Sequence, residues 1–236
     1  MNRDDRRERF SQVRVYALGS EPHDDLRNTS TPSERLAMVE ALSRSAWRLA
    51  GVPASTIPRS QWPVRISTLR SGPLVAASTQ PPAFLNEDFD DFLKALLAAR
   101  ARFLVVGAHA LAVHGVPRAT GDLDVWIDRT PANATRIWDA LLAFGAPIEA
   151  LGLSVDDLQA PDQVIQLGVR PSRIDLLTDL TGVAFDEAWP KRMKLAAGET
   201  EIPFVGRETL LANKRATGRL KDRADLEALG ALDDPS

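Results

Sequence analysis

The sequence contains no cysteine. This absence excludes disulfides, cysteine-based metal sites and thiol nucleophiles, and a reducing cytoplasm, where we expect the protein to act, accounts for it most easily. No apolar run approaches the ~20 residues that a membrane-spanning helix requires, so we expect no membrane partner. The N-terminal residues Met1 to Arg9 carry mixed charge without an apolar stretch, which is not the pattern of a secretory signal.

Length and composition predict one main domain with an appendage. The 236 residues exceed the roughly 100 to 200 residues of a typical domain, and the hydrophobic content of 44% can bury a core. The net charge of -3 argues neither for nor against a nucleic-acid partner, because a local basic surface can bind phosphates on an acidic protein.

The composition divides the chain into three segments. Residues 1–70 combine a strand-like alternation at 13–18 with one amphipathic helix over about 32–50, which begins at the capping box Thr31-Pro32-Ser33-Glu34. The predicted apolar face of this helix carries Leu36, Val39, Leu42, Ala46 and Leu49. One helix and one strand cannot close a core, so we expect this small module to dock on the rest of the chain or on another protein. Residues 71–84, rich in Ser, Thr, Pro and Gly, are typical of a linker.

Residues 85–236 alternate predicted helices and strands, which is typical of an α/β (α+β) fold. We predict helices at about 86–97, 108–114, 131–144, 208–216 and 222–229. We predict strands at 103–106, around Asp122, and at 164–169 and 174–177, the last two forming a hairpin. A further strand at 202–205 contains Pro203 and is predicted to lie at an edge. The expected architecture is a small twisted mixed sheet flanked by helices.

Aspartates in predicted strands are the main candidate functional residues. Successive side chains of a strand point to opposite faces, so Asp122 and Asp124 share one face while Leu123 and Val125 are buried on the other. Asp175, in a later strand, offers a third carboxylate. Neighbouring carboxylates repel each other unless positive charge lies between them, and a pair of divalent cations commonly supplies it. The alternative interpretation is a pair of solvent-facing acids on an edge strand.

This pattern is typical of metal-dependent nucleotidyl transfer. We predict that Asp122 and Asp124 bridge two Mg²⁺ ions, and that Asp175 completes the acceptor-side metal and draws the proton from the incoming hydroxyl. Gly107 lies between an apolar strand and a helix, so backbone amides there can face a phosphate, although a strand-to-helix turn needs a glycine anyway. Arg118, four residues before Asp122, either reaches the nucleotide phosphates or is an exposed loop arginine.

Basic residues gather around a glycine turn at 213–225. One interpretation is a solvated pair of helices. The other places Lys214 on the triphosphate and the remaining charges near an acceptor such as RNA, whose binding would weaken with salt. His109 and His114 are five residues apart, which is the wrong spacing for a helical zinc pair, so we predict structural or surface roles for both.

Residues from about 85 to 230 resemble the minimal nucleotidyltransferases of the DNA polymerase β superfamily, whose pattern is a glycine turn, Asp-x-Asp and a later strand aspartate. The segments that resemble its bacterial toxin-antitoxin-associated branch are Val106-Gly107-Ala108, His114-Gly115, Pro117-Arg118-Ala119-Thr120, Asp122-Leu123-Asp124, Arg173-Ile174-Asp175 and Asn213-Lys214-Arg215 with Asp222 and Asp225. The resemblance implies a polymerase-β-like fold, an NTP donor and Mg²⁺.

The resemblance also implies roles for individual residues. The nucleotide-binding residues would be Gly107, Ala108, Arg118, Thr120 and Lys214. By similarity to abortive-infection toxins of that branch, Lys214 and Asp225 would take part in catalysis. Ala108 departs from the serine that many members use to contact the phosphates, so backbone amides must compensate there.

Residues 1–70 are similar to short polypeptides found beside such transferases, which implies a fused companion that can fold back on the enzyme. We therefore expect a bacterial nucleotidyltransferase of a toxin-antitoxin system that modifies an RNA 3′ end, tRNA included, or a protein hydroxyl. Two alternatives stay open. The N-terminal module could mask the site and make the chain an antitoxin-like binding protein, or the same metals could serve phosphoryl transfer.

Overall fold

A computed structural model describes residues 26–49, 59–68, 87–148, 152–168, 172–197 and 200–231 of the chain. The strand predicted at 13–18 and the linker predicted at 71–84 lie outside the described residues. None of the described helices combines the length and the apolar character that crossing a membrane requires.

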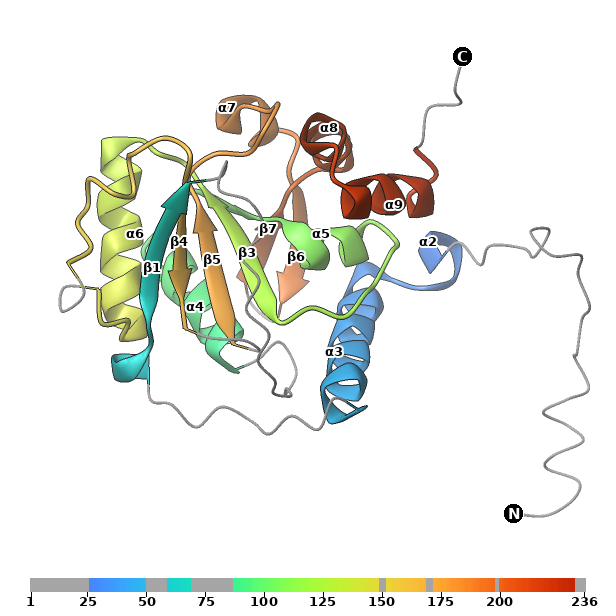
Figure 1. Cartoon of the computed structure of the whole chain (residues 1–236), viewed down its shortest axis with the longest axis horizontal. Helices are drawn as coiled ribbons and strands as arrows, with labels where there is room; N and C mark the ends of the chain where they lie inside the picture. Colours follow the sequence, from blue (N-terminus) through green and yellow to red (C-terminus); the bar gives the residue numbers. More distant parts are fainter. Residues whose placement is uncertain are drawn as a thin grey trace, which may run out of the picture.

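One mixed sheet of seven strands organises the described residues, which confirms the expected α/β class (Figure 1). Its order is β1 (Val64–Thr68), β4 (Gln163–Leu167), β5 (Arg173–Leu177), β3 (Asp122–Ile127), β2 (Phe103–Val105), β7 (Thr200–Phe204) and β6 (Met193–Ala197). β3 pairs in parallel with β5 and antiparallel with β2. The Asp-x-Asp strand is therefore an interior strand, and the alternative interpretation that placed it at an edge is wrong.

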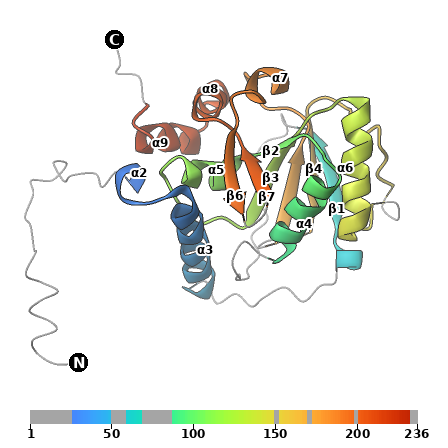
Figure 2. The same cartoon turned by 180° about the vertical axis from the view of Figure 1, so that it is seen from behind.

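Two amphipathic helices lie on the same side of the sheet (Figure 2). α4 (Glu87–Ala98) buries four of the five apolar residues predicted to face inward, Phe89, Phe92, Leu93 and Leu96, while Leu97 is half-buried. α6 (Pro131–Phe144) begins at its predicted proline and ends before Gly145, whose φ of 83° is typical of a C-cap glycine. These helices pack against each other and cover one face of the sheet, so the opposite face is left for polar side chains.

The other helices are short or lie beyond the sheet edges. They are α2 (Leu26–Thr29), α3 (Pro32–Leu49), η1 (Arg59–Gln61), α5 (Gly107–Val113), α7 (Phe185–Ala188), α8 (Arg207–Thr217) and α9 (Leu220–Ala228). α8 packs against α9, and α3 packs against α5. The bounds of α8 and α9 agree with the predicted ranges 208–216 and 222–229 to within two residues at each end.

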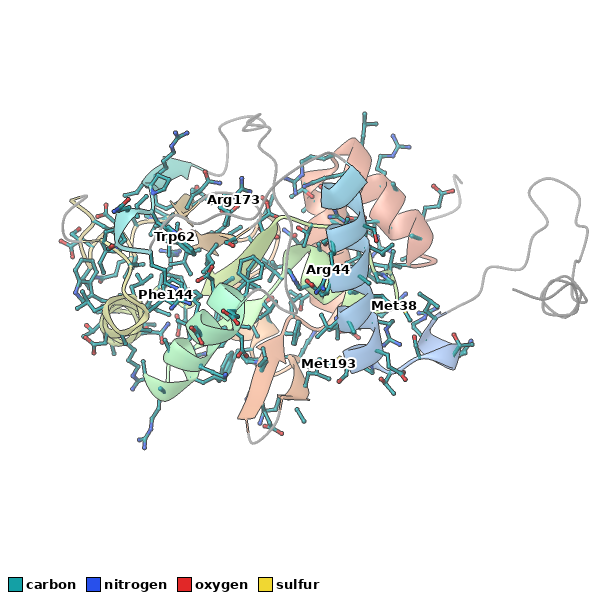
Figure 3. The ribbon with its side chains drawn as sticks, turned by 90° about the horizontal axis from the view of Figure 1, so that it is seen from below. Met38, Arg44, Trp62, Phe144, Arg173 and Met193 are labelled. Carbon is teal, nitrogen blue, oxygen red and sulfur yellow. The ribbon has the colours of Figure 1, made fainter. Side chains whose placement is uncertain are left out.

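Among the described residues before residue 70, those of α3, η1 and β1 each contact the rest of the chain. α3 packs against α5, and β1 pairs antiparallel with β4, with Arg65 opposite Gln166. Trp62, just before β1, is 4% exposed and packs edge-on against Phe144 of α6, with ring centroids 5.7 Å apart (Figure 3). Sequence analysis did not predict β1, because the strand is short and follows Pro63.

The buried face of α3 matches the predicted one only in part, since Val39 is buried and Leu36 packs against the core as predicted. Arg35, Val39 and Ser43 are buried at four-residue spacing, whereas Leu42 of the predicted apolar face is 45% exposed. Two of the three buried residues are polar, and both have hydrogen-bond partners elsewhere in the chain. The predicted capping box is confirmed by a 2.6 Å hydrogen bond from the Thr31 amide to Glu34 and a 3.2 Å bond from the Glu34 amide to the Thr31 hydroxyl.

The strand predicted at 202–205 is not an edge strand. β7 lies between β2 and β6, and β6 forms the edge of the sheet. The sequence of β6, Met193-Lys194-Leu195-Ala196-Ala197, consists of good helix formers, so local propensity gave no strand signal. Pairing with β7 decides its conformation instead.

Candidate active site

The three predicted carboxylates lie on one face of adjacent strands. Asp124 of β3 is paired with Asp175 of β5, and Asp122 lies two residues earlier on the same face of β3. Leu123 and Val125 are fully buried on the opposite face, as the alternation predicts. The carboxylate face is the one away from α4 and α6, and Arg173 lies on that side of the sheet in Figure 3.

Arg173 joins two of the three carboxylates. Its guanidinium donates to Asp175 through Nε at 2.8 Å and Nη2 at 2.9 Å, and Nη2 also donates to Asp122. Gln166 of β4 adds contacts of 3.3 Å from Nε2 to both Asp175 oxygens. Sequence analysis assigned no role to Arg173 or Gln166. The signal for Arg173 was the alternation itself, which places residues 173 and 175 on the same face.

Thr120 holds Asp122 from the other side. Its Oγ1 donates to Asp122 Oδ1 at 2.6 Å, while its backbone amide donates to Ser43 Oγ of α3 at 3.0 Å. The resemblance implied a nucleotide contact for Thr120. In the structure its hydroxyl orients a carboxylate, so Asp122 is fixed between Thr120 and Arg173.

Asp124 packs against the predicted glycine turn. A Cβ placed on Gly107, whose φ is +60°, would lie 1.9 Å from Asp124 Oδ2. Although some of the Asp124 surface reaches solvent, burial is the main cause that raises its pKa to about 7, and the charges of Asp122 and Asp175 raise it further. Ala108, the next residue of the turn, is 2% exposed. The close approach of Asp124 explains why this turn needs glycine.

The carboxyl of Asp175 is also perturbed. Burial raises its pKa above the ordinary value, and the charge of Asp122 adds to the rise. Arg173 and Gln166 oppose the shift by stabilising the ionised form. The carboxylate cluster is therefore short of positive charge even with Arg173 in place.

Lys214 and Asp225, the predicted catalytic pair, are directly bonded to each other. Lys214 is 5% exposed, and its Nζ lies 2.5 Å from Asp225 Oδ2 and 3.2 Å from Asp222 Oδ1. Burial would raise the pKa of Asp222, but hydrogen bonds from Arg219 and Thr217 outweigh it and hold this pKa below its ordinary value. The charge of Lys214 is thus balanced within the α8–α9 pair.

Arg118 connects that ion-pair cluster to the loop before Asp122. Its Nε lies 3.5 Å from Asp225 Oδ1, and its side chain is 39% exposed. Arg118 is therefore partly exposed and has an acidic partner within the chain. The contact links the middle of α9 to the loop that leads into β3.

Lys221 is an exposed cation close to the carboxylates that sequence analysis missed. It lies in the first turn of α9, and its charge acts to lower the pKa of Asp124. Lys221 and Asp225 are four residues apart, so they share the face of α9 that meets Arg118. Spacing alone cannot tell which of the two lysines acts on Asp124, and the sequence interpretation assigned the triphosphate to Lys214.

His109 and His114, for which structural or surface roles were predicted, are both buried. His109 is 5% exposed, packs edge-on against Phe89, and has its pKa lowered by burial to about 4. His114 Nε2 lies 2.8 Å from the Val205 carbonyl oxygen. Burial favours the structural interpretation of both residues over the surface one.

The donor chemistry of the site fits a hard divalent cation, since all three side chains offer carboxylate oxygens whose mutual repulsion a cation would relieve. Within the described ranges, no three His, Cys, Asp or Glu side chains are grouped as they would be around a metal ion. Arg173 instead lies between Asp122 and Asp175 and supplies the positive charge there.

Comparison of the chain with protein-family models gives no match, and comparison with curated proteins gives none either.

Proposed function

We propose that this chain is a Mg²⁺-dependent nucleotidyltransferase with a polymerase-β-like catalytic domain. The observation that carries the proposal is the gathering of Asp122, Asp124 and Asp175 on one face of two paired parallel strands. The pKa of Asp124, raised to about 7, supports it further, because a site built to hold cations concentrates carboxylates that repel each other without them.

In this proposal, Asp122, Asp124 and Asp175 would hold the cation. Bound Mg²⁺ would supply charge neutralisation for the triphosphate and the acceptor oxygen. The acceptor hydroxyl oxygen attacks the α-phosphorus of an NTP, the bond from that phosphorus to the bridging oxygen breaks, and pyrophosphate leaves with the electron pair. Asp175, held in place by Arg173 and Gln166, accepts the hydroxyl proton.

Nucleotidyl transfer also requires a positively charged side chain that binds the triphosphate. We assign this role to Lys221, because Lys221 is exposed and its charge acts on Asp124, while Lys214 is buried in bonds to Asp222 and Asp225. Lys214 then keeps α8 and α9 together and holds Lys221 in position. The amides of Gly107 and Ala108 and the guanidinium of Arg118 stay candidates for further phosphate contacts.

The acceptor proposed is an RNA 3′ end, tRNA included, or a protein hydroxyl, in a toxin-antitoxin setting. The test is incubation of the full chain with Mg²⁺ and each α-labelled NTP, using total bacterial RNA or cell protein as the acceptor. Asp124→Asn should lower label transfer at least about 100-fold, because several kcal/mol of charge stabilisation depend on the cation site. Asp139→Asn, an exposed aspartate on α6, is the matched control.

Parallel incubations with γ-labelled NTPs separate the proposed reaction from its alternatives. Transfer of label from γ-labelled but not α-labelled NTP would replace nucleotidyl transfer by phosphoryl transfer. Equal label transfer by wild type and Asp124→Asn would remove the carboxylates from the mechanism. No transfer with any NTP and acceptor would leave the binding-protein alternative as the better account.

A further inference from the structure

Helix α3 packs against the rest of the protein with a face that contains two polar residues. Arg35 and Ser43, each 4% exposed, are buried on either side of Val39, while Leu42 stays 45% exposed. Burying polar groups costs free energy unless their hydrogen bonds are made. The partners of these two side chains therefore indicate what α3 is placed to do.

Arg35 fixes α3 to the C-terminal end of α5. Its Nε donates to the Ala112 carbonyl at 2.9 Å and its Nη2 to the Val113 carbonyl at 2.7 Å. The carbonyls at a helix end have no partner within the helix, so a guanidinium satisfies them well. α5 begins at Gly107 beside Asp124, so Arg35 ties α3 to a helix whose other end lies in the carboxylate site.

Ser43, two turns further along α3, reaches the loop before β3. Its Oγ accepts the Thr120 amide at 3.0 Å, and the Thr120 hydroxyl donates to Asp122 Oδ1 at 2.6 Å. Two hydrogen bonds, joined through the covalent structure of Thr120, thus connect α3 to the first carboxylate. Fixing the Thr120 backbone also fixes where its short side chain can place the hydroxyl.

We propose that Ser43 is a positioning residue for Asp122 and that α3 is a structural part of the carboxylate site rather than a mask over it. The proposal rests on the cation-binding role assigned to Asp122 above. Without the Ser43 acceptor, the Thr120 amide loses a buried partner and the loop moves, so Asp122 is no longer held between Thr120 and Arg173.

The test measures Mn²⁺ binding to the full chain by the electron paramagnetic resonance signal of free Mn²⁺. Ser43→Ala should weaken Mn²⁺ binding about three- to tenfold, the effect of losing one part-buried hydrogen bond. Ser45→Ala, an exposed serine on the same helix, should bind Mn²⁺ like wild type. Melting temperatures of all variants are recorded to separate loss of positioning from loss of fold.

Variants of Thr120 distinguish a positioning role of Ser43 from a general contribution to stability. Thr120→Val should weaken Mn²⁺ binding as Ser43→Ala does, and Thr120→Ser, which keeps the hydroxyl, should restore it. Because Ser43 acts through Thr120, the double variant Ser43→Ala/Thr120→Val should bind no more weakly than Thr120→Val alone. Wild-type affinity in Ser43→Ala, or effects that multiply in the double variant, would overturn the role of Ser43 and leave the proposed function intact. Absence of Mn²⁺ binding by the wild type would overturn the cation site, and the role of Ser43 with it.

Discussion

Gly107 sets how closely α5 can approach the carboxylate of Asp124. Gly107→Ala would place a methyl group 1.9 Å from Asp124 Oδ2 at a φ of +60°, so the carboxylate must move and the backbone is strained. We expect nucleotidyl transfer to fall at least about tenfold, together with a loss of about 1–3 kcal/mol of stability. Label transfer and urea unfolding measure the two effects.

Gly145 provides the matched control for that substitution. It also has a positive φ, of +83°, but a Cβ there meets nothing within 4 Å. Gly145→Ala should therefore lose stability from the backbone conformation and keep its activity. If both variants lost activity in proportion to stability, the contact between Gly107 and Asp124 would have no special part in the site.

His109 predicts how stability depends on pH. Burial lowers its pKa from 6.5 to about 4, with Asp122 opposing the shift and Arg118 adding to it. Between these pH values the unfolded chain binds a proton that the folded chain does not, so stability falls as pH decreases from about 6.5 to 4. The contribution amounts to about 3 kcal/mol. His109→Gln should reduce the difference between urea unfolding at pH 7 and pH 4.5, and an unchanged difference would show that His109 is not the group responsible.

At the level of elements, the contacts of α8 and α9 predict different effects for substitution of Lys214 and of Lys221. Lys214→Met leaves Asp222 and Asp225 without their shared partner, so we expect about 3–5 kcal/mol lower stability. Lys221→Ala removes an exposed charge, so stability should stay unchanged while NTP binding weakens about tenfold. Urea unfolding and titration with a fluorescent NTP make the comparison.

The control for the lysine pair is Lys94→Ala, an exposed lysine of α4 on the covered side of the sheet. It should change neither measurement by much. A stable Lys214→Met variant with weakened NTP binding, beside a neutral Lys221→Ala, would return the triphosphate role to Lys214, as the sequence resemblance implied.

Elements with a strong local signal could be predicted from the sequence. The apolar spacing of α4, the proline and glycine at the ends of α6, and the alternation of β3 each depend on nearby residues alone. The same alternation placed Asp122 and Asp124 on one face of β3, whereas only strand pairing could bring Asp175 beside Asp124.

Elements fixed by distant partners could not be predicted. β6 has helix-forming residues and becomes a strand through β7. The face of α3 is chosen by Arg35, whose partners Ala112 and Val113 lie 77 and 78 residues away in the sequence. Arg173 was within a quoted motif, but its bridge to Asp122 exists only because β3 and β5 are neighbours.

At the scale of the whole molecule, residues 26–49 and 59–68 contact the rest of the described chain through helix packing and strand pairing. β1 covers the edge of β4, and the buried Trp62 fills the space beside Phe144 and Gly168. An uncovered strand edge invites aggregation, and removing a buried tryptophan costs about 3–5 kcal/mol. The masking alternative predicts that residues 80–236 alone are more active than the full chain, whereas these contacts predict the opposite.

We therefore expect the fragment 80–236 to unfold at a lower urea concentration than the full chain and to transfer no more label per folded molecule. Trp62→Ala in the full chain separates the loss of the core contact from the loss of α3 and β1. This variant removes the tryptophan side chain and leaves both elements in the sequence. If the fragment were as stable as the full chain and more active, residues before 80 would mask the site, and the positioning role of α3 would be wrong. If Trp62→Ala lowered stability but kept activity per folded molecule, the loss of activity in the fragment would belong to α3 and its hydrogen-bonded connection through Thr120 to Asp122.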